Sequence, residues 1–197
     1  MAKKSSYNAK DIEVLEGLEP VRKRPGMYIG STNQDGLHHL VNEVLDNSID
    51  EVLAGHATDI SFQYKKDGSI KIKDNGRGIP IDFHPKYKNK RALEVVLTTL
   101  HAGGKFNSNA YKTSGGLHGV GISVVNALSS LLQVQVFKDG KVYRQDYSKG
   151  KVKSKIKIEK CSKKLKGTEI SFIPDESIFE ETQFVPKKLY NFINMKS

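Results

Sequence analysis

The chain has very little cysteine and no long apolar run, and both absences restrict what it can be. Cys161 is the only cysteine among 197 residues, so it can form neither a disulfide within the chain nor a thiolate metal cluster, and we expect a reducing compartment. No stretch approaches the length of a membrane span, and the N-terminal MAKKSSYNAK lacks the apolar core of a signal peptide. We therefore expect the chain to be cytoplasmic and without membrane contact. Because 37% of its residues are hydrophobic, we also expect it to form one domain with a sizeable core.

Two common nucleotide-binding fingerprints are also missing. No Gly-Lys-Ser/Thr occurs, which argues against a P-loop, and the glycine-rich segment HAGGKFNSNAYKTSGGLHGVG at 101–121 does not follow a strand as a dinucleotide fingerprint would. This segment still contains six glycines and leads into an expected helix at 120–128, so its backbone N–H groups can face an anion. We predict a phosphate cradle with Lys105 and Lys112 within reach, and a flexible surface loop is the alternative.

Residues 37–55, LHHLVNEVLDNSIDEVLAG, predict an amphipathic helix with two stripes. The apolar residues recur at helical spacing and are Leu37, Leu40, Val41, Val44, Leu45, Val52 and Leu53. The second stripe is polar and consists of His39, Glu43, Asn47 and Asp50. A Glu with a His one turn before it and an Asn one turn after it can orient a water, accept its proton and hold a hydrated Mg²⁺. The alternative is a solvated face, although surface helices favour Glu and Lys over Asn, Asp and His.

A β-hairpin is expected next, because 60–64 and 69–73 alternate apolar with polar residues around a Lys-Asp-Gly turn. Its second strand leads into DNGRGIP at 74–80, where two glycines let the backbone approach a flat ligand. A carboxylate at the end of such a strand, here Asp74, can accept a hydrogen bond from an exocyclic amine and so select adenine. A simple turn is the alternative, because Asn-Gly turns are common.

The rest of the chain predicts helices at 91–100 and 186–195, a hairpin of 131–137 and 141–147, and strands at 152–158 and 168–173. The formal net charge is +10, and much of it lies in 149–166. Lysines alternate along the expected strand there and are Lys151, Lys153, Lys155 and Lys157. This favours a solvent-facing surface over a DNA-binding patch, because no aromatic residues interleave with the lysines for stacking.

Three motifs occur in an order that resembles the GHKL ATPases, the superfamily of gyrase, Hsp90, MutL and histidine kinases. They are Glu43-x-x-x-Asn47, Asp74-x-Gly76-x-Gly78 and the run Gly115, Gly116, Leu117, His118, Gly119, Val120 and Gly121. Within that superfamily, EVLEGLEPVRKRPGMYIGS, DNGRGIP, LHAGGKF and SGGLHGVGISVVNALS resemble the ATPase domain of bacterial type IIA topoisomerase B subunits over nearly the whole chain. Residues 82–88, followed by ALEVVLTTLHAGGKF, are more similar to the topoisomerase IV kind than to the gyrase kind.

The resemblance implies an α+β fold, the GHKL (Bergerat) α/β sandwich, in which helices cover one face of a mixed sheet. All of 1–197 would form one N-terminal ATPase domain, with a dimerisation arm at 1–20 and an ATP lid at 101–121. A transducer domain and a TOPRIM domain would follow outside the chain. With the A subunit of topoisomerase IV, the full protein would use ATP to pass one DNA duplex through another and so decatenate and relax DNA. The B subunit of gyrase, which supports negative supercoiling, is the alternative.

The same resemblance implies roles for single residues. Glu43 would be the general base that activates water, His39 would orient that water, and Asn47 would bind Mg²⁺. Asp74 would recognise the adenine of ATP with help from Thr168 and an ordered water. Arg77 would pair with Glu51 at the floor of the pocket, and Pro80 would form its outer wall. Further nucleotide contacts are expected from Gly78, Ile79, Lys105, Lys112 and residues 115–121.

The resemblance also implies contacts with inhibitors and with a partner. Arg144 would be the arginine at the pocket rim that coumarin-type inhibitors contact. Tyr7 and Ile12 would belong to an arm that reaches the nucleotide of a partner, so we expect a homodimer on ATP binding and a monomer without it. The family's transducer lysine, which contacts the γ-phosphate, lies outside this chain, so we expect slow hydrolysis.

Two other kinds of GHKL protein are alternatives. A module that senses nucleotide without hydrolysis would lack the general base, and Glu43 argues against it. A histidine kinase would carry a phosphoacceptor His on a dimerisation helix before residue 37, and the sequence predicts no such helix. His118 lies in the expected lid and is read as a lid-positioning residue.

Overall fold

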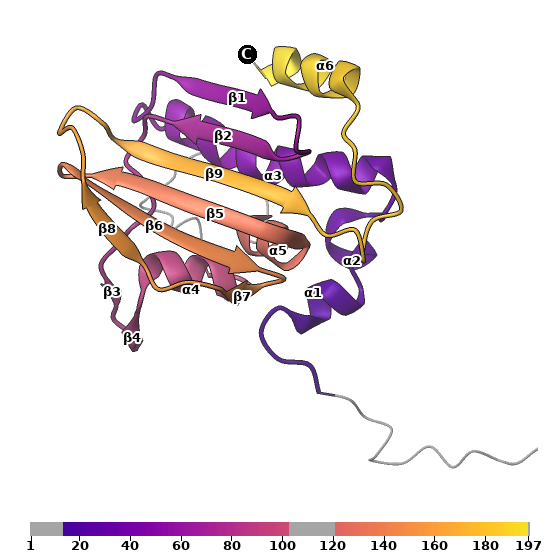
Figure 1. The fold of residues 1–197 in the computed structure, drawn as a ribbon, viewed down its shortest axis with the longest axis horizontal. Coiled ribbons are helices and arrows are strands. Elements are labelled where there is room, and N and C mark those ends of the chain that lie inside the picture. Colours follow the sequence, from indigo (N-terminus) through magenta and orange to yellow (C-terminus); the bar gives the residue numbers. More distant parts are fainter. Residues whose placement is uncertain (1–13, 103–120, 197) are drawn as a thin grey trace, which may run out of the picture.

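A sheet of seven strands lies at the centre of the residues that the computed structural model describes, which are 14–102 and 121–196 (Figure 1). In spatial order the strands are β1 (Ile60–Tyr64), β2 (Ile70–Asp74), β9 (Gly167–Pro174), β5 (Ser129–Lys138), β6 (Lys141–Ser148) and β7 (Lys151–Val152), and β8 (Lys157–Lys160) also pairs with β6. Each of these pairings is antiparallel, so the described strands do not include the parallel pairs of a mixed sheet. The reason is that β1–β2 and β5–β6 are hairpins, and β9 runs between them, antiparallel to both β2 and β5.

Three of the described helices cover one face of this sheet, and the other face is open toward the viewer of Figure 1. They are α3 (Gln34–Leu53), α4 (Ala92–Thr98) and α5 (Gly121–Ala127). The short α1 (Glu19–Lys23) and α2 (Gly26–Ile29) lie at one end of the sheet, and α6 (Pro186–Lys196) lies near the β1 edge. The expected α+β class with helices on one face is confirmed. Among the helices described, none has the length and apolar character that crossing a membrane requires.

The helix α3 starts earlier than the sequence predicts, and its last turn is less buried. It begins at Gln34 because the side chain of Asn33 accepts a hydrogen bond from the backbone N–H of Asp35 at 2.9 Å and caps the helix. The first part of the expected apolar face is buried and comprises Leu37, Leu40, Val41, Val44 and Leu45. Val52 and Leu53 are instead 38% and 61% exposed, because the part of the chain that the structure describes does not cover the last turn on this side. Their assignment to the apolar face that packs is therefore wrong.

The predicted single strand at 152–158 is also wrong, because the structure divides it into β7 and β8. The N–H groups of Lys153 and Ser154 both donate to the carbonyl oxygen of Asp146, at 2.8 and 3.3 Å. The Asp146 N–H in turn donates to Ser154 Oγ at 3.0 Å. Lys153 and Ser154 thus both face Asp146, as in a β-bulge, and the ladder of hydrogen bonds along β6 is interrupted between β7 and β8.

The other predicted elements are confirmed with shifts of a few residues at their ends, and residue 120 of the helix expected at 120–128 lies outside the described residues. The sequence did not indicate α1, α2 or a second sheet formed by β3 (Phe83–His84) and β4 (Tyr87–Arg91). The residues of β4 read YKNKR, so they show none of the alternation that identifies a half-buried strand.

Candidate functional site

Asp74 is the last residue of β2 and the buried acceptor around which the candidate site forms. Its Oδ1 accepts hydrogen bonds from the N–H groups of Gly76 at 2.9 Å and Thr168 at 3.3 Å, and its Oδ2 accepts one from Ser48 Oγ at 3.2 Å. Asp74 is 6% exposed, and burial raises the pKa of its carboxyl above the ordinary value despite these three donors. Among the described residues its hydrogen-bond donors are all neutral. A carboxylate has about four acceptor positions, so Asp74 has capacity for a further hydrogen bond from a ligand.

Two glycines allow close backbone contacts in this region: Gly167 contacts Asp74, and Gly78 contacts Gly167. Gly167 has φ +105°, and a Cβ there would overlap the carbonyl oxygen of Asp74. Gly78 has φ +76°, and a Cβ there would lie 2.9 Å from Cγ1 of Val136. A side chain at either position would separate the start of β9 from the loop 75–80. The sequence drew attention to Gly78 and missed Gly167, whose signal was a glycine directly before the expected strand at 168–173.

Arg77 forms a bidentate ion pair with Glu51 near the end of α3, the pair that the family resemblance implied. Its Nη2 lies 2.7 Å from Oε1 of Glu51, and its Nε donates to Oε2 at 3.2 Å. Because two parallel bonds fix the relative orientation of the groups, this pair holds the loop 75–80 against α3. The hydroxyl oxygen of Thr168 accepts a hydrogen bond from the Ile79 N–H at 3.2 Å and holds the same loop against β9. Pro80, at the end of this loop, is exposed.

The polar face of α3 carries a His–Glu pair next to α5. His39 Nε2 lies 3.0 Å from Glu43 Oε1. The hydrogen bond with Glu43 raises the pKa of His39 above its ordinary value, although burial acts in the opposite direction. The other carboxylate oxygen of Glu43 faces Gly121, the first residue of α5, where a Cβ would overlap it. The structure therefore places one oxygen of Glu43 against His39 and the other against the start of α5.

Asn47 lies one turn after Glu43, and its Nδ2 donates to the carbonyl oxygen of Glu43 at 2.8 Å. Its amide is thereby held along the same face of α3. Asp50 is fully buried, so its assignment to the exposed polar stripe is wrong, because tertiary contacts cover the end of α3 on this side. Ser48, which donates to Asp74, was missed. Its signal was a polar residue at helical spacing from Val44 and Leu45, on the stripe that packs.

Some predicted residues are not part of the observed site. Tyr7, Lys105, Lys112, Gly115, Gly116, Leu117, His118, Gly119 and Val120 lie outside the described residues. Arg144 lies in β6, where its Nε donates to Gln135 Oε1 at 3.0 Å and its Nη1 lies 3.1 Å from Glu159 Oε2. The neighbouring Val136 faces Gly78, and side chains alternate along a strand, so Gln135 and Arg144 belong to the open face of the sheet. The structure does not bring Arg144 to Asp74, which contradicts its predicted place at the rim.

Within the described residues, no group of three or more His, Cys, Asp or Glu side chains could hold a metal ion. A metal ion at this site could take ligand oxygens from a bound nucleotide and from water in addition to protein groups. Mg²⁺ bound to phosphates commonly has such a ligand set, and the side-chain oxygen of Asn47 is of the type that it prefers.

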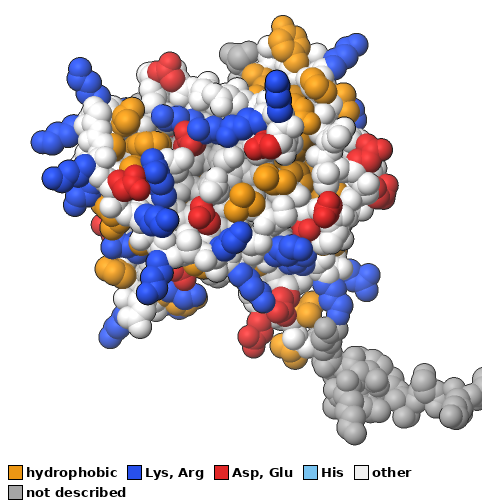
Figure 2. Space-filling view, viewed as in Figure 1, with side chains coloured by type: hydrophobic (Ala, Val, Ile, Leu, Met, Phe, Trp, Pro, Cys, Tyr) orange, Lys and Arg blue, Asp and Glu red, His pale blue; other side chains and the backbone are white. Residues whose placement is uncertain are grey.

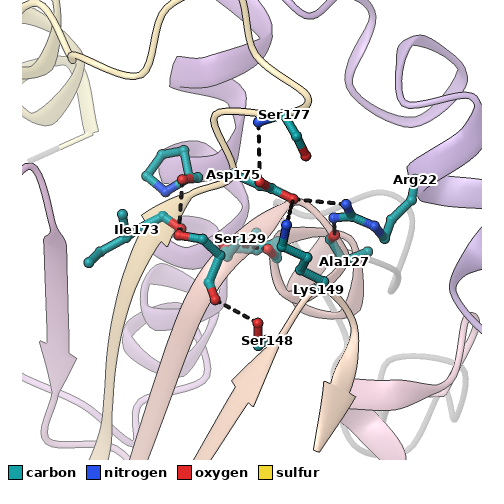
Figure 3. A network of polar contacts seen from close by, with 11 residues as sticks. Arg22, Ala127, Ser129, Ser148, Lys149, Ile173, Asp175 and Ser177 are labelled. Carbon is teal, nitrogen blue, oxygen red and sulfur yellow. Dashed lines mark hydrogen bonds and ion pairs between the residues drawn. The ribbon is translucent and has the colours of Figure 1, made fainter. Parts of the chain in front are cut away.

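A second buried carboxylate lies at the other end of β9 (Figure 3). Asp175 is 1% exposed, and its Oδ2 lies 2.8 Å from Arg22 Nη2 and 3.3 Å from Lys149 Nζ. Its Oδ1 accepts a hydrogen bond from the Ser177 N–H at 3.2 Å. Burial by itself raises the pKa of Asp175, but Arg22 and the other donors together bring it below the ordinary value. Arg22 Nη1 also donates to the carbonyl oxygen of Ala127 at 2.7 Å, so this network ties α1 to the end of α5.

The sequence and the fold both match a known ATPase family. The sequence model for the histidine kinase-, DNA gyrase B- and HSP90-like ATPases matches residues 32–178, so the chain belongs to this family.

Within the family, the chain is similar to B subunits of bacterial DNA topoisomerases. The B subunit of DNA topoisomerase 4 from Rickettsia bellii (strain RML369-C) is 60% identical over 194 residues, which are 98% of this chain and 29% of that protein. The B subunit of DNA gyrase from Thermotoga maritima is 58% identical over 180 residues, which are 91% of this chain and 28% of that protein. The crystal structure of the 43K ATPase domain of Thermus thermophilus gyrase B in complex with an aminocoumarin has a TM-score of 0.80 and 42% identity, over 91% of this chain and 44% of that one. The chain thus spans less than a third of the length of these curated relatives.

Proposed function

We propose that this chain is the ATP-binding and ATP-hydrolysing domain of the B subunit of a bacterial topoisomerase IV. The observation that carries the proposal is the buried carboxylate of Asp74, which three neutral donors hold next to a backbone lined by Gly78 and Gly167. Membership of the ATPase family supports it, as does 60% identity to the Rickettsia bellii topoisomerase 4 protein over 98% of the chain.

Adenine would be recognised by its exocyclic amine, which donates a hydrogen bond to Asp74. The flat base would lie against the backbone at Gly78, where no side chain intervenes. Thr168 would take part through its hydroxyl group, which already fixes Ile79. The pair of Arg77 and Glu51 would keep the floor of the pocket in place, and Pro80 would form its outer wall.

Hydrolysis would depend on the polar face of α3. Glu43 would accept a proton from the attacking water, while His39 holds one oxygen of that carboxylate at 3.0 Å and so fixes the orientation of the other. Asn47 would bind Mg²⁺, which neutralises the charge on the phosphates when it is bound. Lys105, Lys112 and residues 115–121 would contact the phosphates from the lid.

In the whole protein, this domain would form a homodimer on ATP binding and act on DNA together with the A subunit of topoisomerase IV. An aminocoumarin would compete with ATP at Asp74, because the Thermus thermophilus gyrase B domain was solved in complex with one. The second candidate is the corresponding domain of gyrase B, given 58% identity to the Thermotoga maritima protein. Decatenation without negative supercoiling by the full-length protein with its A subunit would support topoisomerase IV, and ATP-dependent negative supercoiling would contradict it.

The main test is the affinity of Asp74→Asn for a non-hydrolysable ATP analogue, measured by calorimetry. The change replaces an oxygen acceptor by a group that can present a donor to the adenine amine, so we expect binding weaker by at least about tenfold. Asp35→Asn removes a carboxylate that is 82% exposed at the start of α3 and serves as the matched control. Unchanged affinity of the Asp74 variant would refute the adenine assignment.

A second test separates chemistry from binding. In the full-length protein, Glu43→Ala should lower the ATPase rate by about 100-fold or more, because a general base contributes that much. Nucleotide affinity should stay within about threefold, since Glu43 would act on water and not on the base. Loss of affinity in parallel with the rate would mean that Glu43 binds the metal or maintains the fold.

A further inference from the structure

Positive charge is concentrated along one edge of the sheet. Residues 149–166 contain nine lysines and one acid, Glu159, and so carry a net +8 of the chain's formal +10. They form β7, β8 and the adjoining segments, and β7 and β8 pair with opposite ends of β6 at the edge remote from β1. Figure 2 shows many Lys and Arg side chains on the β8 side of the molecule. The lysine edge is defined as Lys138, Lys141, Lys151, Lys153, Lys155, Lys157, Lys160, Lys163 and Lys164.

Lysines of this edge face one another directly across strands. Lys138 of β5 is in register with Lys141 of β6, and Lys141 is in register with Lys160 of β8. Like charges directly opposite each other destabilise a sheet. Lys163 adds a fourth charge beside this row, because its Cγ lies 3.1 Å from the position that a Cβ on Gly140 would take. The row therefore has an electrostatic cost that a surface selected for stability alone would avoid.

Acidic partners are present elsewhere on the same sheet. Lys71 Nζ lies 2.7 Å from Glu169 Oε1 on the open face. Glu159 lies next to the lysine edge, but Arg144 already pairs with it at 3.1 Å. Among the ion pairs of the described residues, none involves a member of the lysine edge. The charge of this edge is thus available to an external partner.

The simpler explanation for lysines at a sheet edge is that their charge prevents the exposed edge strand from pairing with another chain. Lys157 and Lys160 would serve that purpose for β8. The charge continues, however, through 153–155 and 161–166, which are outside the strands and have no ladder to protect. Edge protection therefore accounts for only part of the lysine edge.

We propose that the lysine edge binds the phosphate backbone of duplex DNA. Lys151 is in register with Ser148 of β6 and Lys160 with Lys141, which lies seven residues earlier. At about 3.3 Å per residue, the segment from Lys151 to Lys160 therefore spans roughly 23 Å, about two thirds of one duplex turn. No aromatic side chain occurs in 149–166, an absence that in the sequence favoured a solvent-facing surface over a DNA-binding patch. It argues only against stacking on unpaired bases, so a duplex fits this edge better than a single strand. Lysine contacts to phosphates carry no sequence information, so the binding is independent of base sequence. Binding of DNA to the lysine edge also does not involve Asp74 or Glu43.

The test is fluorescence anisotropy of a labelled duplex of about 30 base pairs, titrated with this chain at several salt concentrations. The triple variant Lys141→Gln, Lys160→Gln, Lys163→Gln should bind at least about tenfold more weakly at low salt. The slope of log affinity against log salt should become shallower by about 3, because each phosphate contact contributes roughly 0.9. The matched control is Lys65→Gln, Lys66→Gln, Lys187→Gln, which removes the same charge from exposed lysines elsewhere. The affinity of this control variant for the duplex should stay within about twofold of that of the unmodified chain.

Equal losses in the edge variant and the control would overturn the proposal, since binding would then follow net charge. Polyglutamate that releases the labelled duplex as readily as unlabelled duplex does, or a single strand bound as tightly as the duplex, would also overturn it. If the first variant fails to fold, Lys151→Gln, Lys153→Gln, Lys155→Gln, outside the row, should show the same change in slope. Calorimetry with the ATP analogue should give unchanged affinity for both edge variants, so failure here is distinguishable from failure of the proposed function.

Discussion

Asp74 and Asp175 are both buried aspartates at strand ends, and they are stabilised in opposite ways. They lie at the two ends of β9, with Asp74 bonded to Thr168 near its start and Asp175 directly after its last residue, Pro174. Burial raises the pKa of Asp74, whose three donors are neutral. Burial acts on Asp175 in the same direction, but Arg22 and the other donors bring its pKa below the ordinary value.

The comparison separates a carboxylate that serves the fold from one that can serve a ligand. Asp175 already has two cations within 3.3 Å, so a further donor would add little to its stabilisation. Asp74 is stabilised less completely, and a donor from a ligand would relieve part of the unfavourable burial. This explains why Asp74, and not the more deeply buried Asp175, is the residue that we assign to recognition of adenine.

The largest expected effect is on Asp175. Arg22→Met should lower the free energy of unfolding by about 3 kcal/mol, because it leaves the buried charge of Asp175 with Lys149 as its remaining cation, 3.3 Å away and half exposed. Urea denaturation followed by circular dichroism measures this. Lys90→Met, which breaks an exposed pair with Glu94 at 3.4 Å, is the control and should cost less than about 0.5 kcal/mol. A loss below about 1 kcal/mol for Arg22→Met would show that Asp175 does not depend on Arg22.

A smaller effect is expected when Asp74 loses one of its neutral donors. Ser48→Ala should cost about 1 kcal/mol in the free energy of unfolding, the usual contribution of one hydrogen bond. The same urea experiment applies, with the exposed Ser61→Ala as control. If the loss were as large as that of Arg22→Met, the two aspartates would depend on their donors equally, and the distinction between them would not hold.

The smallest effect is a pH dependence of opposite sign at the two aspartates. The folded pKa of Asp175 lies below its ordinary 3.8, so the advantage of the unmodified chain over Asp175→Asn is complete above pH 3.8 and shrinks as the pH falls through the folded pKa. The folded pKa of Asp74 lies above 3.8, so the unmodified chain gains stability relative to Asp74→Asn as the pH falls toward 3.8. Urea curves at several pH values between about 7 and 3 measure both differences. If both stability differences changed with pH in the same direction, the proposed contrast between Asp74 and Asp175 would be wrong.

The sequence by itself determined the parts of the site that lie within short segments. The helical spacing of His39, Glu43 and Asn47 placed these residues on one face of α3, because a turn of helix has nearly constant geometry. The hairpin pattern before DNGRGIP placed Asp74 at the end of a buried strand for the same local reason. The order of these motifs was enough to predict the ATPase family and the α+β class, which the comparisons and the fold confirm.

Only the tertiary structure decided which distant residues meet and which face each side chain takes. Thr168 donates to Asp74 across 94 positions of sequence, and nothing local to either residue indicates this contact. Arg144 lies on the open face because the register of β5 and β6 sets it opposite Gln135, and a step of one residue would reverse its direction. Asp50 is buried although its helical phase matches that of Glu43, because the elements packed along α3 differ from one turn to the next. Periodicity describes the phase of a side chain within its own element, whereas burial depends on what packs against that element.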